Sequence, residues 1–263
     1  MTTGSNLDLH IYTNNTDGGN DKVSYLCETA AAKGLRAVAF TDLCDLAAFD
    51  PADSLRRIRH SFFDMLKAKK LFCESVLVLA GIEFANILFE PQQAAKILIK
   101  QEYDIVLTSI TKLRSGKTVS PDSDETAVRD FTADYVSELL TVIDNTDFDV
   151  LSRLMLPYRD LTNIPSDLAD AFVPVLTALS CKNAALEINT RDLTGSVKIR
   201  NIYFNIINKY RELGGTRITF GSESYFHDDV GNGLDLAMTT AARAGFNSVT
   251  LYEKRTPYEL PIN

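Results

Sequence analysis

Residues that could bind a metal ion or an anion fall at the ends of several short predicted strands. His10 and Tyr12 end the alternating stretch LDLHIYT. A strand that carried His-x-His to its end would be typical of the start of a metal site, but here the second place is Tyr12. The other predicted strand ends carry Asp42, Glu83, Thr111, Arg153, Glu187, Asn189, Glu223 and Tyr225. Because parallel α/β barrels build their sites where strands end, this set predicts one common pocket.

The elements that must position these residues repeat along the chain. A helical pattern, a turn and a short β-rich run recur at 27–42, 208–222 and 239–253. Gly34, Gly214 and Gly245 stand where each helix needs a left-handed C-terminal cap. The strands are predicted at 7–11, 36–41, 75–82, 104–109, 148–152, 184–188, 217–221 and 247–252. Short apolar strands that alternate with amphipathic helices favour one closed parallel barrel over residues 1–263.

Composition excludes several classes of protein. The net charge of −8 opposes binding to nucleic acid, which requires a surplus of Lys and Arg. No run approaches the ~20 apolar residues of a membrane span, and the polar start is unlike a signal peptide, so we expect a cytoplasmic protein. The four cysteines have no C-x-x-C spacing and indicate reduced, mostly packed thiols. The basic stretch RRIRH at 56–60 indicates a solvated helix face, with an anion site as the alternative.

Seven motifs occur in order along the chain: LDLHIYT, AFTDL, AGIEF, DIVLTSIT, FDVLSRLMLP, ALEINTRDL and ITFGSESYFHDDVG. Their order and spacing resemble those of the PHP (polymerase and histidinol phosphatase) family, most closely its histidinol-phosphatase branch. The resemblance runs from residue 6 to about 252 and is strongest over 184–250. It implies a distorted, TIM-like barrel of seven β/α units, with the predicted strand at 247–252 outside it. It also implies metal ions at the strand ends, held mainly by histidines, that activate water for phosphoester hydrolysis.

Most metal-ligand positions of the family are substituted in this chain. His10 stands at the first place of the family's His-x-His pair, Glu83 keeps a carboxylate that joins metals, and Glu223 replaces an aspartate. The positions at which another residue replaces a histidine are Tyr12, Leu43, Thr111, Arg153 and Tyr225. Of the three histidines in the chain, His60 lies in the basic helix and His227 lies two residues past the expected place, where we expect it exposed. A polyhistidine multimetal site cannot be assembled from this set.

A reduced site remains an alternative. His10, Glu83 and Glu223 offer one nitrogen and two carboxylates, enough in kind for a single hydrolytic Mn²⁺ or Zn²⁺ ion. Arg153 argues against this ion, because a guanidinium group stays protonated and repels a cation. We therefore hypothesise that no metal cofactor binds, and that Arg153 supplies part of the lost positive charge through paired hydrogen bonds to Glu83 or Glu223. Tyr12 and Tyr225 are expected to donate to the same carboxylates.

Three accounts of function follow from these substitutions. The first is a catalytically inactive or much weakened PHP barrel, a pseudoenzyme with a degenerate metal site. The second is an active phosphomonoesterase of the histidinol-phosphate type with one metal. The third is a metal-free module that binds a phosphorylated small molecule through Arg153, Arg159 and Arg191, which follow strand ends where the branch holds the substrate phosphate. No alternative nucleophile motif is present, and the sequence assigns neither a catalytic residue nor a protein partner.

Overall fold

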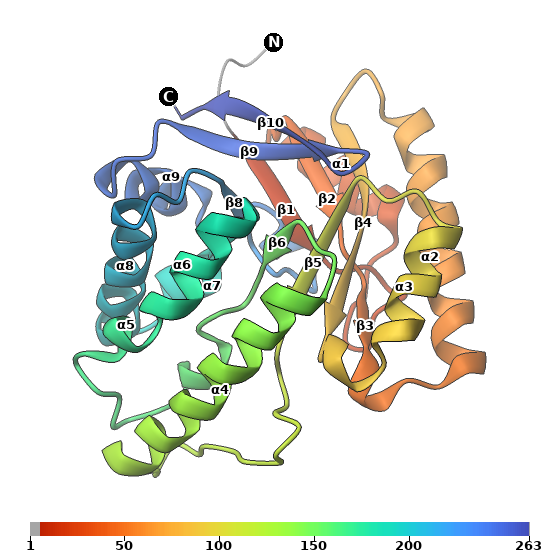
Figure 1. Ribbon diagram of the computed structural model, residues 1–263. Coiled ribbons are helices and arrows are strands. Elements are labelled where there is room, and N and C mark those ends of the chain that lie inside the picture. The colour runs from red at the N-terminus through yellow and green to blue at the C-terminus, as the bar shows by residue number, and fades with distance from the viewer. Residues whose placement is uncertain (1–5, 263) are drawn as a thin grey trace.

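A curved parallel sheet forms the centre of the protein, whose computed structural model describes residues 6–262. Within this range, seven strands pair in the order β1–β2–β4–β5–β6–β7–β8. Their bounds are Leu7–Ile11, Ala37–Phe40, Leu77–Ala85, Ile105–Ser109, Val150–Leu151, Ala185–Asn189 and Ile218–Gly221. The two edges meet through a bridge between Ile11 and Ser224, where the Tyr12 N–H donates to the Ser224 carbonyl at 2.9 Å. The nearly closed sheet confirms the predicted distorted β/α barrel (Figure 1).

Helices follow most of the strands and cover the outside of the barrel (Figure 1). From α1 to α9 they span Val23–Ala32, Pro51–Leu71, Pro91–Lys100, Glu125–Asn145, Leu168–Ala171, Val173–Lys182, Thr190–Thr194, Val197–Glu212 and Leu234–Arg243. Short 3₁₀ turns lie at Leu46–Ala48, Ile87–Phe89, Leu156–Tyr158 and His227–Asp229. In the part of the chain that the structure describes, no helix has the length and apolar character to cross a bilayer.

Local sequence explains where these elements begin and end. Every residue of β1, β2, β5, β7 and β8 is buried, as expected of parallel strands enclosed on both faces. The Asp50 carboxylate accepts from two N–H groups at the start of α2, which has Pro51 in its first turn. Gly34, Gly214 and Gly245 have φ of 71°, 90° and 85°, which confirms the predicted left-handed caps.

Three of the described strands lie outside the barrel path, and two of them were not predicted. The short strand β3 (Leu43–Asp45) pairs with the second half of β4. The predicted strand at 247–252 is β9 (Ser248–Glu253), which pairs with β10 (Thr256–Pro261) in a separate two-stranded sheet. Its place outside the barrel confirms the expectation, whereas β10 itself was missed.

The β9–β10 hairpin covers the ends at which β5 and β6 begin. Its two-residue turn, Lys254 and Arg255, has positive φ at both positions (49° and 62°) without a glycine. The Arg255 Nε–H donates to Asp149 Oδ2 at 2.7 Å, and the Arg255 N–H donates to the Asp104 carbonyl at 2.8 Å. Asp104 and Asp149 directly precede β5 and the β6 region, so the hairpin closes the amino-terminal end of the barrel. The carboxyl ends of the strands remain available for a site.

The cysteines differ from the expectation in one respect. All four are free thiols, but only Cys27 and Cys44 are buried, while Cys73 and Cys181 are exposed. Burial raises the pKa of Cys27 and of Cys44 to about 12, so these two thiols stay protonated.

We predict that Arg255→Ala lowers the free energy of unfolding by about 1–3 kcal/mol, because the buried Asp149 carboxylate loses a charged donor. Urea denaturation measures the difference. Lys254→Ala is the matched control, since Lys254 shares the turn and the positive φ but has no ion pair among the described residues. Equal loss in both variants would show that the turn, and not the ion pair, stabilises the hairpin.

Candidate functional site

Charged side chains from five strand ends meet at the carboxyl end of the barrel. His10 lies in β1, Glu83 in β4 and Glu187 in β7, while Arg153 follows β6 and Glu223 follows β8. All five are buried. Together with Tyr12, Arg159 and Asp192, which contact them, they form what we call the strand-end network. Most of the strand-end residues predicted to share one pocket therefore do meet. Asp42 and Thr111 of the same predicted set do not join them.

His10 lies between two carboxylates. Its Nδ1 is 2.5 Å from Glu187 Oε1, and its Nε2 is 3.2 Å from Glu83 Oε2 and 2.9 Å from the Tyr12 hydroxyl. Burial lowers the pKa of His10, but Glu187 and Glu83 outweigh this effect and raise it to about 10. Both ring nitrogens therefore carry protons at neutral pH and act as donors.

The close approach of His10 and Glu187 depends on Gly221, the last residue of β8. A Cβ atom at this position would lie 2.4 Å from Glu187 Oε1 and 2.5 Å from the His10 Cβ. No side chain larger than hydrogen fits without moving one of the two partners. The glycine of the ITFGS motif is thus part of the site.

Glu83 accepts from three hydroxyl groups, from the His10 imidazole and from the Arg153 guanidinium. Its Oε1 lies 2.6 Å from Ser109 Oγ and 3.2 Å from Ser152 Oγ, and its Oε2 accepts from the Tyr12 hydroxyl at 2.5 Å. Burial raises the pKa of Glu83, but Arg153 and His10 reverse this and hold the pKa well below its usual range. The carboxylate is ionised and its lone pairs are occupied by protein donors.

Arg153 points into the network and contacts both Glu83 and Glu223, the two carboxylates predicted from the sequence as its candidate partners. Its Nη1 lies 3.5 Å from Glu83 Oε1 and 3.2 Å from the Tyr12 hydroxyl. Its Nε lies 3.3 Å from Glu223 Oε1 but is not aligned for a hydrogen bond. The backbone at Arg153 is left-handed, with φ of 54°, and its N–H donates to Glu187 Oε2 at 2.8 Å.

The paired hydrogen bonds expected of Arg153 are made by Arg159. Its Nη1 and Nη2 donate to the two oxygens of Glu223 at 3.2 and 2.6 Å, and its Nε donates to Asp192 Oδ1 at 2.6 Å. Burial raises the pKa of Glu223, but Arg159 and Arg153 reverse this and lower it. Burial raises the pKa of Asp192 to about 6 despite Arg159. Because three of its donor nitrogens already bind carboxylates, Arg159 is held within the strand-end network.

Arg191, the third candidate for phosphate binding, lies at the rim. Its side chain is 52% exposed, its Nη1 is 3.8 Å from Glu223 Oε1, and its guanidinium lies 5.9 Å from the centre of the Tyr225 ring. It lines a cavity of about 270 Å³ together with Thr190, Ser222, Ser224, Tyr225 and Asn232, and the carboxylates Glu223 and Asp229 line the same cavity. The Ser224 hydroxyl is buried and has no hydrogen-bond partner among the described residues.

The remaining substituted positions lie apart from the charged centre or at its edge. The Tyr225 ring packs on Tyr12, with 4.6 Å between ring centres. Within residues 6–262, no hydrogen bond joins the Tyr225 hydroxyl to a carboxylate, in contrast to the expectation. Thr111 is exposed and accepts from Asn86 Nδ2 at 2.8 Å. Neither Thr111 nor Leu43 reaches His10.

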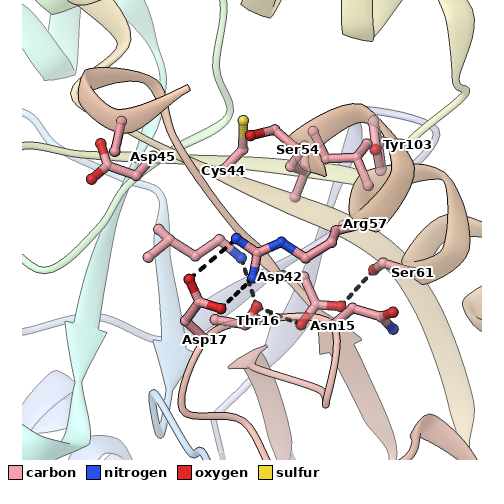
Figure 2. A pocket seen from close by; sticks show the side chains of 15 residues that line it. Asn15, Thr16, Asp17, Asp42, Cys44, Asp45, Ser54, Arg57, Ser61 and Tyr103 are labelled. Carbon is pink, nitrogen blue, oxygen red and sulfur yellow. Dashed lines mark hydrogen bonds and ion pairs between the residues drawn. The ribbon is translucent and has the colours of Figure 1, made fainter. Parts of the chain in front are cut away.

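Leu43 and Asp42 line a separate cavity of about 200 Å³ next to α2. Figure 2 shows Asp42 with Thr16 and Ser61 beside it, and Arg57 paired with Asp17 across the cavity. The Asp42 carboxylate accepts from Thr16 Oγ1 at 2.7 Å and from Ser61 Oγ at 2.5 Å. It also accepts from the backbone and hydroxyl of Thr13, so its role is to anchor the loop after β1.

The other two histidines lie outside the network. His60 is exposed on α2. His227 is partly exposed, and its Nδ1 lies 3.0 Å from Asp21 Oδ2. Among the described residues, no group of three or more His, Cys, Asp and Glu side chains is arranged to hold a metal ion.

Three members of the site were not identified from the sequence. They are the carboxylate Asp192 and the hydroxyls Ser109 and Ser152. Glu187 was among the strand-end residues expected in the common pocket, and an acidic residue inside the otherwise apolar strand ALEIN requires a buried cation. Asp192 and the two serines are of ordinary type for their positions and carried no such signal.

Comparisons with known proteins agree with this architecture. The family model of the PHP domain matches residues 8–191. The histidinol-phosphatase of Lactococcus lactis subsp. lactis (strain IL1403) is 23% identical over 257 residues, which cover 94% of each chain. The crystal structure of histidinol phosphate phosphatase from the same organism, complexed with zinc, L-histidinol and phosphate, superposes with a TM-score of 0.82 at 20% identity, covering 97% of this chain and 99% of that one. The resemblance inferred from the sequence motifs is confirmed: the chain belongs to the PHP domain family and is histidinol-phosphatase-like.

Proposed function

We propose that this chain is a non-hydrolytic PHP protein that binds a phosphorylated small molecule at the carboxyl end of its barrel. In this account the strand-end network replaces the metal ions of active relatives with fixed organic cations. The observation that carries the proposal is the guanidinium group of Arg153 between Glu83 and Glu223. Catalysis that depends on a metal-activated water is then absent or much weakened.

The donor set of the network does not fit a divalent metal ion. A guanidinium group has no lone pair to offer, and it repels a second cation placed between the same carboxylates. The His10 nitrogens both face carboxylates, and a protonated imidazole is not a ligand. The Glu83 oxygens accept from hydroxyl, imidazole and guanidinium donors. A metal would have to displace several of these bonds at once.

Charge balance supports the same conclusion. Four carboxylates of the network face four cations: His10, Arg153, Arg159 and Arg191. Uncompensated buried charges cost several kcal/mol each, so the cations are required whether or not a ligand binds. Arg191 alone among them is exposed on half of its surface, and it faces a cavity. It is therefore the cation best placed to bind an anionic group.

The cavity beside Arg191 suits a small phosphorylated ligand. Guanidinium groups bind phosphate through parallel N–H donors. The Ser224 hydroxyl, which has no partner among the described residues, lines this cavity, and the Tyr225 ring provides an apolar wall. The Thr190 hydroxyl already donates to the Asn232 carbonyl at 2.6 Å. Hydrolysis by a single Mn²⁺ or Zn²⁺ ion on His10, Glu83 and Glu223 remains the competing proposal, which the assay below distinguishes.

We predict no metal-stimulated phosphatase activity. The purified protein is assayed for phosphate release from histidinol phosphate and a panel of phosphomonoesters, with Mn²⁺ or Zn²⁺ added. Because the network lacks an open metal position, release should equal that of Glu83→Ala under every condition. Turnover that rises with metal and disappears in Glu83→Ala would establish the single-metal enzyme and refute the proposal.

Binding of a phosphorylated ligand should depend on Arg191. We expect calorimetric titration with inorganic phosphate and with the phosphomonoester panel to show saturable binding. Arg191→Ala should weaken binding about 10–100-fold, because the variant loses a charge-assisted hydrogen bond to the phosphate. Arg36→Ala is the control, because Arg36 is exposed and has no side-chain partner among the described residues. Equal affinities in the wild type and Arg191→Ala would exclude this site.

Removing the Arg153 side chain should destabilise the fold strongly. Arg153→Ala leaves the buried Glu83 and Glu223 short of a cation, so we expect the free energy of unfolding to fall by about 3–5 kcal/mol. Arg36→Ala should change it by less than about 0.5 kcal/mol. Urea denaturation compares the two variants with the wild type. A small effect of Arg153→Ala would mean that the guanidinium is not needed to neutralise the carboxylates.

A further inference from the structure

A groove on the outside of the barrel, lined by α2 and α3, exposes apolar side chains. It has a volume of about 410 Å³, and Leu55, Ile58, Phe62 and Phe63 of α2 form its walls together with Ile97 of α3. Phe63 is 53% exposed. We call this feature the α2–α3 groove. Its residues share nothing with the strand-end network, so they can be changed without touching that site.

More apolar surface lies on the same two helices. Ile99 near the end of α3 is 85% exposed, and Leu71 at the end of α2 is 75% exposed. Scattered exposed apolar residues are ordinary, but aromatic rings gathered in a groove are typical of surfaces that bind another protein. Phe62 is held in place by an edge contact with Tyr103, with 5.1 Å between ring centres. The groove is therefore preformed.

The charge of this face is opposite to that of the chain as a whole. α2 and α3 contain eight of the 27 Lys and Arg residues but only two of the 35 Asp and Glu residues. Arg59 and Lys100 line the groove, and within residues 6–262 neither forms an ion pair. The same holds for the neighbouring Lys96 and Lys70. Other cations of α2 are paired, such as Arg56 with Asp53 and Lys69 with Asp104.

From this combination we propose that the α2–α3 groove binds an acidic amphipathic segment of a partner protein. Apolar side chains of that segment pack against Phe62, Phe63 and Ile97, and its carboxylates pair with Arg59 and Lys100. Long polyanions such as nucleic acid fit less well, because the net charge of −8 repels the parts of the strand that extend beyond this face. A short acidic segment contacts only the basic face.

A defined peptide tests the proposal. The probe is a fluorescein-labelled helical peptide of about 14 residues, with Leu and Phe at i, i+3, i+4 and i+7, Glu on both flanks and no cation. We expect fluorescence anisotropy to show saturable binding that weakens about tenfold or more in Arg59→Glu/Lys100→Glu and in Phe63→Ser. The control Lys22→Glu/Arg36→Glu reverses two exposed cations elsewhere that have no side-chain partner among the described residues. It should leave the affinity within about twofold.

Several outcomes would overturn the proposal. Circular dichroism first establishes that each variant is folded. Absence of saturable binding up to about 1 mM peptide, or equal loss in the groove variants and the control, removes the groove as a binding site. If a peptide with Gln in place of Glu binds equally well, the groove does not select acidic segments. A wild-type dimer that Phe63→Ser converts to monomer, measured by light scattering, would identify a second copy as the occupant instead.

Discussion

The burial of four carboxylates at one end of a barrel is the constraint on which this structure depends. The buried side chains of Glu83, Glu187, Glu223 and Asp192 lie within a few ångströms of shared cations. Carboxylates in such a place must be paired, because an isolated buried charge costs several kcal/mol. Metal ions and organic cations can each meet that demand. The proposal here is that this chain uses imidazolium and guanidinium groups, which neutralise the carboxylates but do not activate water.

The backbone of the barrel supports the same network. Arg153 and Glu223 are non-glycine residues with φ of 54° and 53°, a left-handed conformation that costs on the order of 1–3 kcal/mol. Hydrogen bonds compensate: the Arg153 N–H donates to Glu187, and Glu223 accepts from Arg159 and Asn189. These bonds fix the side chains of strained residues in one arrangement. A fixed arrangement of charges suits ligand binding, since these side chains lose little conformational entropy when a ligand binds.

The sequence predicted the barrel well because each strand is a short apolar run between amphipathic helices, a pattern that only a covered parallel sheet satisfies. It missed β3, whose three residues pair with an already assigned strand, and β10, whose turn has Lys254 and Arg255 where Asn-Gly would signal a hairpin. At the site, the sequence indicated that Arg153 faces Glu83. It could not show that Arg159 makes the paired bonds to Glu223, because that contact depends on how a loop after β6 folds back over β8.

The most direct test of the central claim is a crystal structure determined from protein equilibrated with excess Zn²⁺ and Mn²⁺, with anomalous scattering recorded at each metal edge. The account predicts no anomalous peak within the ~2.0–2.2 Å coordination distance of His10 or Glu83, and clear density for the Arg153 guanidinium between Glu83 and Glu223. Anomalous peaks that bridge Glu83 and His10, with the Arg153 side chain turned away from both carboxylates, would contradict it.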